Sequence, residues 1–361
     1  MKQGRRFWFI QGPAFDGLFF LGAPLWALLM GFLFSRLSPE QDAVTFLDQQ
    51  TTLTSMVLRT IIHSHLVLVL FRSHGNAKVR RRHPLRFYLV PILLLGAMMV
   101  SLEFLAIVLV VSTYWDMVHS SLQTFGIGRI YDARAGADVD RGRTLDLWLN
   151  HVIYLGPFIA GPLWLAVLQV FALAEREHVP FTLEAAAMIT QVQPAMRMLV
   201  FIAAPAVVIA YAIHVVRRAR AGQPVSRLKL ALFATTATAS VWAWGFNSFG
   251  QALLVVNTFH AVQYFALVWW SERDNMSKLF GTRALPWSQV LTAACFIIVG
   301  LAYGFWLGSV SEQWAVHEGA KRFVLALTNT VALLHFWYDG FIWSVRGGVG
   351  REVAPLDDAV Q

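Results

Sequence analysis

Residues 291–310 read LTAACFIIVGLAYGFWLGSV, an apolar run of 20 residues without a charged side chain. A helix needs about 20 mostly apolar residues to cross the hydrocarbon core of a bilayer. Similar runs recur along the chain, because 57% of its 361 residues are hydrophobic and only 14% are charged. With a mean hydropathy of +0.55, this composition predicts an all-α, polytopic membrane protein rather than a soluble domain.

Hydropathy and loop signals divide the chain into about ten predicted transmembrane spans. These spans cover residues 14–36, 53–71, 85–102, 103–131, 147–173, 197–216, 230–250, 251–270, 287–310 and 321–345. The breaks near residue 102 and near residues 247–250 rest on the weakest signals, since no long polar loop separates the runs there. The lack of repeats and long linkers predicts a single integral membrane domain, residues 1–361.

Arginine and lysine indicate which span ends face the cytoplasm, because short loops rich in these residues stay on that side. The basic residues are concentrated in alternate loops, such as residues 72–86 (RSHGNAKVRRRHPLR) and 217–229 (RRARAGQPVSRLK). This pattern predicts an even number of spans with both termini in the cytoplasm. The expected location is the inner, or plasma, membrane of a bacterial-type cell.

Charge and cysteine content exclude other classes of protein. The net charge of +8 comes from residues in short loops, which disfavours a nucleic-acid-binding surface. The single cysteine, Cys295, excludes an intramolecular disulfide and a thiolate-rich metal site. Any bound metal is therefore expected to use histidine, aspartate, glutamate or asparagine side chains.

Polar side chains occur inside four of the predicted spans, where an ionisable group is costly and usually has a partner or a function. They are His63 and His65 in the second span, Asp116, His119 and Gln123 in the fourth, Asn257, His260, Gln263 and Tyr264 in the eighth, and His335 and Asp339 in the tenth. The other histidines are expected at surfaces or span ends. They are His74, His83, His151, His178, His214 and His317.

Helical spacing pairs two of the intramembrane histidines with an acid. Asp116 precedes His119 by three residues and Asp339 follows His335 by four, so each pair shares a helix face. Counted from the predicted cytoplasmic ends at 1.5 Å per residue, His119, His260 and His335 lie roughly 15 to 18 Å deep. Ligands from facing helices at one depth are typical of a metal or haem site in a helical bundle.

His63 and His65 lie roughly 9 to 12 Å from the predicted cytoplasmic end of their span. Being two residues apart, they point in different directions around the helix, so only one is expected to face the common centre. The candidate metal ligands are therefore His63 or His65, together with His119, His260 and His335.

This donor set indicates a class of metal and of chemistry. Imidazoles with one or two carboxylates suit Fe(II), Cu or Zn, and the lack of sulfur disfavours Cu(I) and iron–sulfur centres. Fe(II) is favoured, because three or four histidines and a carboxylate leave positions for O2 and substrate. Asp116, Asp339 and Tyr264 are the candidate catalytic side chains, and the depth of the site favours a hydrophobic substrate from the bilayer.

Three stretches resemble a known family of membrane enzymes. They are HSSLQTFGIGRIYD (119–132), FHAVQYFALVW (259–269) and LLHFWYDGFIWSVR (333–346). They look like the histidine boxes of Brp/Blh-type membrane carotenoid (β-carotene) dioxygenases, which have a histidine before Phe-Gly, a histidine in an aromatic helix and a late histidine near an aspartate. The resemblance implies an iron-dependent, O2-using membrane oxygenase. The ligands that it implies are His119, His260 and His335, with His63 or His65 as the fourth.

Two alternatives use the same residues. In a haem b electron-transfer protein, two or four of these histidines would be axial ligands. In a transporter, the histidines and aspartates would form a path for protons or metal ions. The sequence contains no motif for NAD, flavin or ATP, so it does not identify an electron donor.

Overall fold

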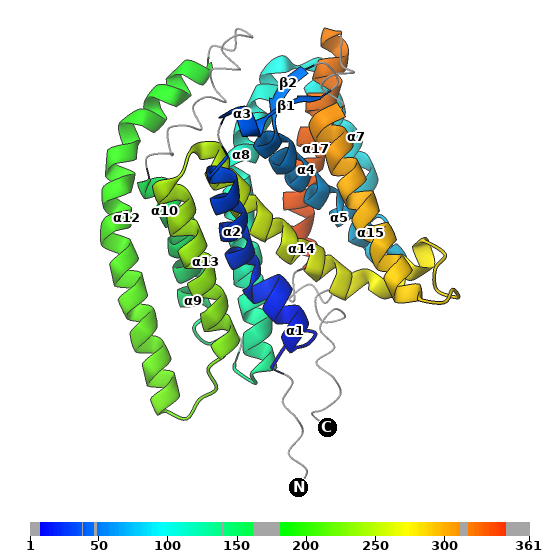
Figure 1. Ribbon diagram of the computed structural model, residues 1–361. Helices are drawn as coiled ribbons and strands as arrows, with labels where there is room; N and C mark the ends of the chain where they lie inside the picture. Colours follow the sequence, from blue (N-terminus) through cyan, green and yellow to red (C-terminus); the bar gives the residue numbers. More distant parts are fainter. Residues whose placement is uncertain are drawn as a thin grey trace. The chain divides into compact units, whose positions relative to one another are not determined.

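The computed structural model describes residues 8–37, 39–46, 49–138, 140–161, 181–310 and 317–343. Helices form nearly all of this described part (Figure 1), which confirms the predicted all-α class. The only sheet among these residues is an antiparallel pair of short strands, β1 (Ala43–Phe46) and β2 (Gln49–Thr52). Thr52 then caps the next helix by accepting a hydrogen bond from the Ser55 amide at 3.1 Å.

The chain divides into two compact units, each made of two segments. Unit 1 comprises residues 1–42 and 113–263, and unit 2 comprises residues 43–112 and 264–361. Two long helices, α8 (Leu102–Arg134) and α14 (Phe249–Leu279), continue from one unit into the other. The predicted single membrane domain stays a prediction.

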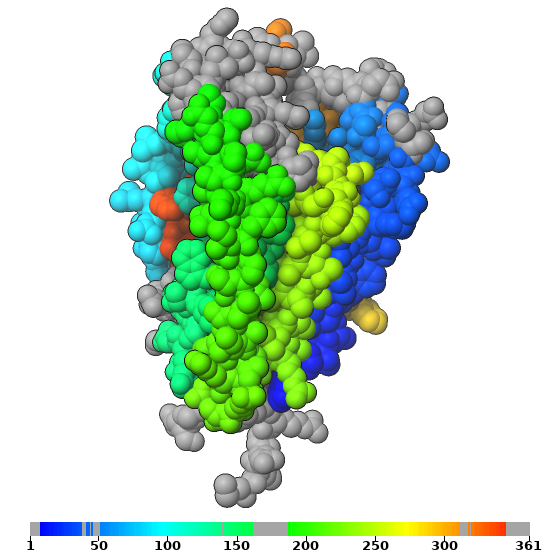
Figure 2. Space-filling model, turned by 90° about the vertical axis from the view of Figure 1, so that its left-hand side faces the viewer, coloured from blue at the N-terminus to red at the C-terminus, as the bar shows by residue number. Residues whose placement is uncertain are grey.

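Unit 1 is built from helices of both of its sequence segments, residues 1–42 and 113–263. They are α1 (Pro13–Asp16), the π-helix η1 (Gly17–Leu21), α2 (Ala23–Ser35), α3 (Pro39–Asp42), α9 (Arg143–Tyr154), α10 (Gly156–Ala160), α12 (Phe181–Arg220) and α13 (Arg227–Phe246), with the adjoining parts of α8 and α14. Helix α12 packs on α9 and α10, and α13 packs on α2 and α9. The outward side of α12, green in Figure 2, is apolar and exposed along most of its length.

Unit 2 contains the helices that carry the second, third, ninth and tenth predicted spans. They are α4 (Leu53–Val67), α5 (Val69–Ser73), α6 (Ala77–Arg82), α7 (Pro84–Val100), α15 (Ser288–Phe305), the π-helix η3 (Trp306–Val310) and α17 (Glu318–Ile342). Helix α4 packs on α15, and α17 packs on α4, α5 and α7.

Three glycines of α15 and η3 allow a close approach to α4. A Cβ atom on Gly304 would overlap the backbone of Thr60 and Ser64, and a Cβ on Gly308 would overlap Arg59. A Cβ on Gly300, one turn earlier, would lie 3.0 Å from the Phe265 ring and 3.2 Å from Leu68, which is tighter than an ordinary contact. Small residues at intervals of four are a common means of close packing between membrane helices. This stripe fixes α4, and therefore His65, against α15.

Among the described residues, five helices are long and apolar enough to cross a membrane. They are Leu53–Ser73, Leu102–Arg134, Thr190–Arg220, Phe249–Leu279 and Ser288–Val310. A sixth is reached if Pro13–Leu21 and Ala23–Ser35, bent by 48° at their junction, form one span. These helices support the prediction of a membrane protein, but they are fewer than the ten predicted spans.

The predicted span boundaries agree with several helix ends. The two weakest predicted breaks are present, because α7 ends at Val100 before α8 begins at Leu102, and α13 ends at Phe246 before α14 begins at Phe249. Residues 162–173 of the fifth predicted span lie outside the described residues, as do residues 344–345 of the tenth and the arginines at positions 5 and 6.

Candidate functional site

Unit 2 brings together side chains from three helices, which we call the unit 2 histidine group: His65 of α4, Tyr264 of α14, and His335 and Asp339 of α17. The ring centroids of His65 and His335 lie 5.3 Å apart, and those of Tyr264 and His335 lie 4.6 Å apart. His65 and His335 are 0% exposed and Tyr264 is 1% exposed. All four are candidate site residues from the sequence, and Asp339 is half-buried beside the three buried side chains.

The carboxylate of Asp339 is oriented by two neutral donors. The Tyr264 hydroxyl and the Trp343 indole N–H both donate to Oδ1, at 2.9 and 3.0 Å. The other oxygen, Oδ2, lies 3.8 Å from Nε2 of His335. The sequence also allows an ion pair between Asp339 and Arg346, seven residues later, but Arg346 lies outside the described residues.

His65 and His63 differ in their surroundings, as their spacing predicted. His65 is fully buried beside His335, whereas His63 is half-buried. Nδ1 of His65 lies 3.2 Å from the carbonyl oxygen of Ile61. Because a carbonyl only accepts, Nδ1 is the protonated nitrogen, and a neutral ring then has its lone pair on Nε2. A backbone partner of this kind is typical of a histidine that binds a metal through its other nitrogen.

A buried ion pair adjoins the unit 2 histidine group. Nη1 of Arg72 on α5 lies 2.6 Å from Oε1 of Glu272 on α14, and both side chains are at most 3% exposed. Asn76 donates to the second oxygen of Glu272 at 3.0 Å. The guanidinium of Arg72 also lies 4.3 Å from the centre of the Trp343 ring, and Trp343 is the residue that bonds Asp339. In the sequence, Arg72 is recognisable only as a topology signal in the basic loop 72–86.

Unit 1 contains a second histidine pair, His119 of α8 and His260 of α14. Their ring centroids lie 5.3 Å apart with the ring planes at 87°, and both side chains are buried. Gln123, one turn after His119, donates its amide to the His260 carbonyl at 3.0 Å. This bond ties α8 to α14 next to the pair, and it reaches the backbone of His260 rather than its ring.

Two acidic residues of unit 1 differ in their surroundings. Asp116 is half-buried, one turn before His119 on α8. Asp16 accepts hydrogen bonds from the Ile10 amide at 2.6 Å and from the Tyr131 hydroxyl at 3.0 Å. Asp16 therefore fixes the entry of the chain into α1.

Two polar residues of α14, Asn257 and Gln263, bond to backbone carbonyls. Asn257 donates its side-chain amide to the Leu253 carbonyl, one turn earlier on α14, at 3.0 Å. Gln263 donates to the Phe20 carbonyl of η1 at 2.9 Å. Both amides thus bond to backbone, which is the common structural role of such residues in membrane helices.

Two of the histidines expected at surfaces or span ends have hydrogen-bond partners. His74 is half-buried directly after α5, and its ring nitrogens lie 2.9 Å from the Ser73 hydroxyl and 2.9 Å from the Phe87 carbonyl. His151 lies 3.1 Å from the Ser121 hydroxyl. His317 is exposed at the start of α17, as predicted, and His178 lies outside the described residues.

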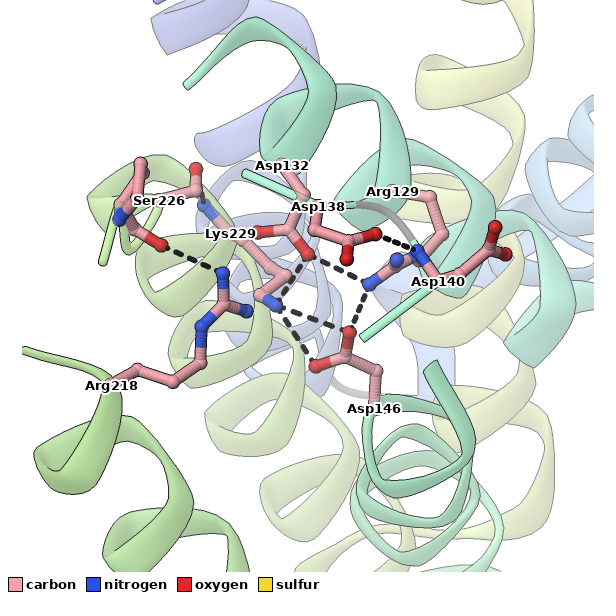
Figure 3. Close-up of polar contacts among 9 residues, drawn as sticks. Arg129, Asp132, Asp138, Asp140, Asp146, Arg218, Ser226 and Lys229 are labelled. Atoms are coloured by element: carbon pink, nitrogen blue, oxygen red, sulfur yellow. Dashed lines mark hydrogen bonds and ion pairs between the residues drawn. The ribbon is translucent and has the colours of Figure 1, made fainter. Parts of the chain in front are cut away.

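Unit 1 also buries a charged cluster, which comprises Arg129 and Asp132 of α8, Asp146 of α9 and Lys229 of α13 (Figure 3). Nζ of Lys229 lies 2.7 Å from Asp132 and 2.9 Å from Asp146. Nη1 of Arg129 lies 2.8 Å from Asp132 and also pairs with Asp146. Two cations thus balance two carboxylates, so the protein itself supplies the positive charge that a metal ion would otherwise bring.

The described residues therefore form a histidine pair in unit 1 and, in unit 2, a group of two histidines, a tyrosine and an aspartate. The prediction that one centre uses ligands from both units stays a prediction. The chain matches no protein-family model, no curated protein and no solved structure in the comparisons made.

Proposed function

We propose that this chain is a membrane-embedded metalloenzyme that uses O2 to oxidise a hydrophobic, lipid-soluble substrate. The observation that carries the proposal is the unit 2 histidine group, in which two buried imidazoles and one carboxylate lie together. Two histidines and a carboxylate are the ligand set of many non-haem Fe(II) oxygenases, and they leave open positions on the metal. Iron is thus the preferred cofactor, ahead of copper.

The donor chemistry of the group fits such a metal. His65 would bind through Nε2, because its Nδ1 faces the Ile61 carbonyl. Asp339 would bind through Oδ2, because its Oδ1 already accepts two hydrogen bonds. His335 would complete the set, and the bound metal would supply a position at which O2 can react.

The surrounding residues orient these ligands and exclude water. Tyr264 and Trp343 hold the Asp339 carboxylate in one orientation, a role that outer residues commonly have at metal sites. Val67, Leu68 and Val268 belong to the same apolar cluster as Tyr264 and are buried. An apolar cluster of this kind favours a hydrophobic substrate and disfavours competing reactions with water.

The unit 1 pair is proposed to bind metal as well. His119 and His260 provide two further buried imidazoles, and Asp116, one turn before His119 on α8, would orient His119. The resemblance to Brp/Blh-type dioxygenases implies the same residues. Ten spans, with both termini in the cytoplasm of an inner membrane, remain part of this proposal.

Metal analysis combined with an absorption spectrum tests the proposal on the purified full-length chain. We expect bound iron without the intense band of haem near 400 nm, and O2 consumption that depends on added lipid-soluble substrate and reductant. A haem spectrum would instead support the electron-transfer alternative. Flux of protons or metal ions in proteoliposomes without O2 consumption would support a transporter.

A further inference from the structure

A basic cavity of about 430 Å³ lies in unit 2, at the corner where the end of α14 meets the start of α15. Its basic lining residues are Arg273, Lys278 and Arg283, and its one acidic lining residue is Asp274. Three cations less one carboxylate give the lining a formal charge of +2. This cavity is therefore suited to an anion.

The neutral lining residues add hydrogen-bond donors. Ser288 and Gln289 lie in the first turn of α15, where backbone N–H groups have no partner within the helix and the helix dipole favours negative charge. Thr292, buried in the wall, bonds to Thr282 and to the Ser288 carbonyl. These bonds hold the connecting loop on α15 and give the cavity a fixed wall.

Exposed apolar side chains stand beside the basic cavity. Leu285 is 50% exposed and Trp287 is 81% exposed, although both are large apolar residues. Trp287 has φ of 60°, a left-handed conformation that is unfavourable for a bulky residue. Exposed tryptophan next to basic residues is typical of the membrane–water interface. The predicted topology places this corner on the cytoplasmic side, where anionic lipids are found.

We propose that this cavity binds the phosphate group of an anionic phospholipid. Arg273, Lys278 and Arg283 would contact the headgroup, while Leu285 and Trp287 would insert among the lipid chains. A phosphate ion in solution would satisfy the basic residues alone, and the adjoining apolar residues favour the lipid as its source. The site is independent of the proposed oxygenase activity.

The test uses the full-length chain in a mild detergent, titrated with short-chain phosphatidylglycerol and followed by native mass spectrometry. The cavity variant replaces Arg273, Lys278 and Arg283 by Gln, and the matched control replaces Lys78, Arg81 and Arg82 by Gln. The control removes the same charge from the same unit and the same predicted side. We expect lipid binding to the cavity variant to be weaker by on the order of 100-fold. Each of the three basic residues near an anionic headgroup should contribute about fivefold to the affinity. The affinity of the control variant for phosphatidylglycerol should change by less than about threefold.

The same titration is made with phosphatidylcholine and with inorganic phosphate. Both should bind at least about tenfold more weakly than phosphatidylglycerol. Equal weakening of binding in the control variant would show general charge attraction and overturn the proposal. Equally tight binding of inorganic phosphate would identify a site for soluble anions and would also overturn it. If the triple variant does not fold, Arg283→Gln on the exposed loop should still weaken binding by severalfold, and unchanged binding would contradict the proposal.

Discussion

The two units bury polar groups in different ways. In unit 1, the charged cluster pairs Lys229 and Arg129 with two carboxylates, so that opposite charges of the chain neutralise each other. In unit 2, Asp339 is held by a tyrosine hydroxyl and an indole N–H and lies beside the His335 imidazole. The comparison shows that burial of charge alone does not identify a site. The chemistry of the partners separates a structural ion cluster from a candidate metal centre.

The largest effect is expected from disrupting the charged cluster of unit 1. Lys229→Ala leaves two buried carboxylates facing Arg129 alone, and loss of one partner from a buried ion pair costs about 3–5 kcal/mol. We expect a large drop in the thermal midpoint of unfolding, measured by the loss of the monodisperse peak after heating. Arg227→Ala is the control, because Arg227 is exposed two residues away on the same helix. A similar drop in both variants would contradict the assigned role of the cluster.

The next prediction concerns metal rather than stability. His65→Ala and His335→Ala should each lower metal affinity by at least 10–100-fold, the range seen even for residues that only orient metal ligands. The measurement is metal content per folded protein, and His317→Ala is the control because this histidine is exposed. Full metal content in both variants would refute a metal centre in the unit 2 histidine group.

The same measurement on His119→Ala and His260→Ala compares the two histidine groups directly. If one centre uses ligands from both units, these variants should lose as much metal as the unit 2 variants. If each group binds its own metal, they should lose only part of it. Unchanged content would leave the unit 1 pair as a packing contact between α8 and α14.

Sequence reasoning predicted the relations within one helix better than those between helices. The i, i+4 spacing placed His335 and Asp339 on one face, and the break at residues 247–248 followed from turn-forming residues. Trp343 follows Asp339 by the same interval of four, so its bond to Asp339 could have been predicted as well. The glycines at 300, 304 and 308 likewise form a visible repeat.

Contacts between distant segments could not be predicted in this way. Arg72 and Glu272 are separated by 200 residues, and nothing in either local pattern indicates the other. Lys229 was assigned to a cytoplasmic loop because basic residues cluster around it, yet its aliphatic chain lets the ammonium group reach two buried carboxylates. Charge near a helix end is thus ambiguous between a topology signal and a buried partner.

A smaller effect is expected from Asp339→Asn. The amide keeps the shape of the carboxylate and can still accept a hydrogen bond from Tyr264 or Trp343, but it is a weaker metal ligand. If Asp339 binds the metal, metal content should fall in parallel with activity. If Asp339 only orients His335, most of the metal should remain while activity falls. Unchanged metal and unchanged activity would make Asp339 a structural residue and remove the carboxylate from the proposed ligand set.

The smallest effect is expected from Trp343→Phe, which removes one of the two donors to Oδ1 of Asp339 and keeps a ring near Arg72. The Tyr264 hydroxyl still holds the same oxygen at 2.9 Å, so we expect most of the metal to remain and turnover to fall only severalfold. Adding Tyr264→Phe removes the second donor, and the combined loss should then exceed the product of the two single losses, because either donor alone can orient the carboxylate. Strictly multiplicative losses, measured as turnover per bound metal, would show that the two residues do not act on a common group. That result would contradict the assigned hydrogen-bond arrangement in unit 2. It would leave the evidence for the charged cluster of unit 1 unchanged.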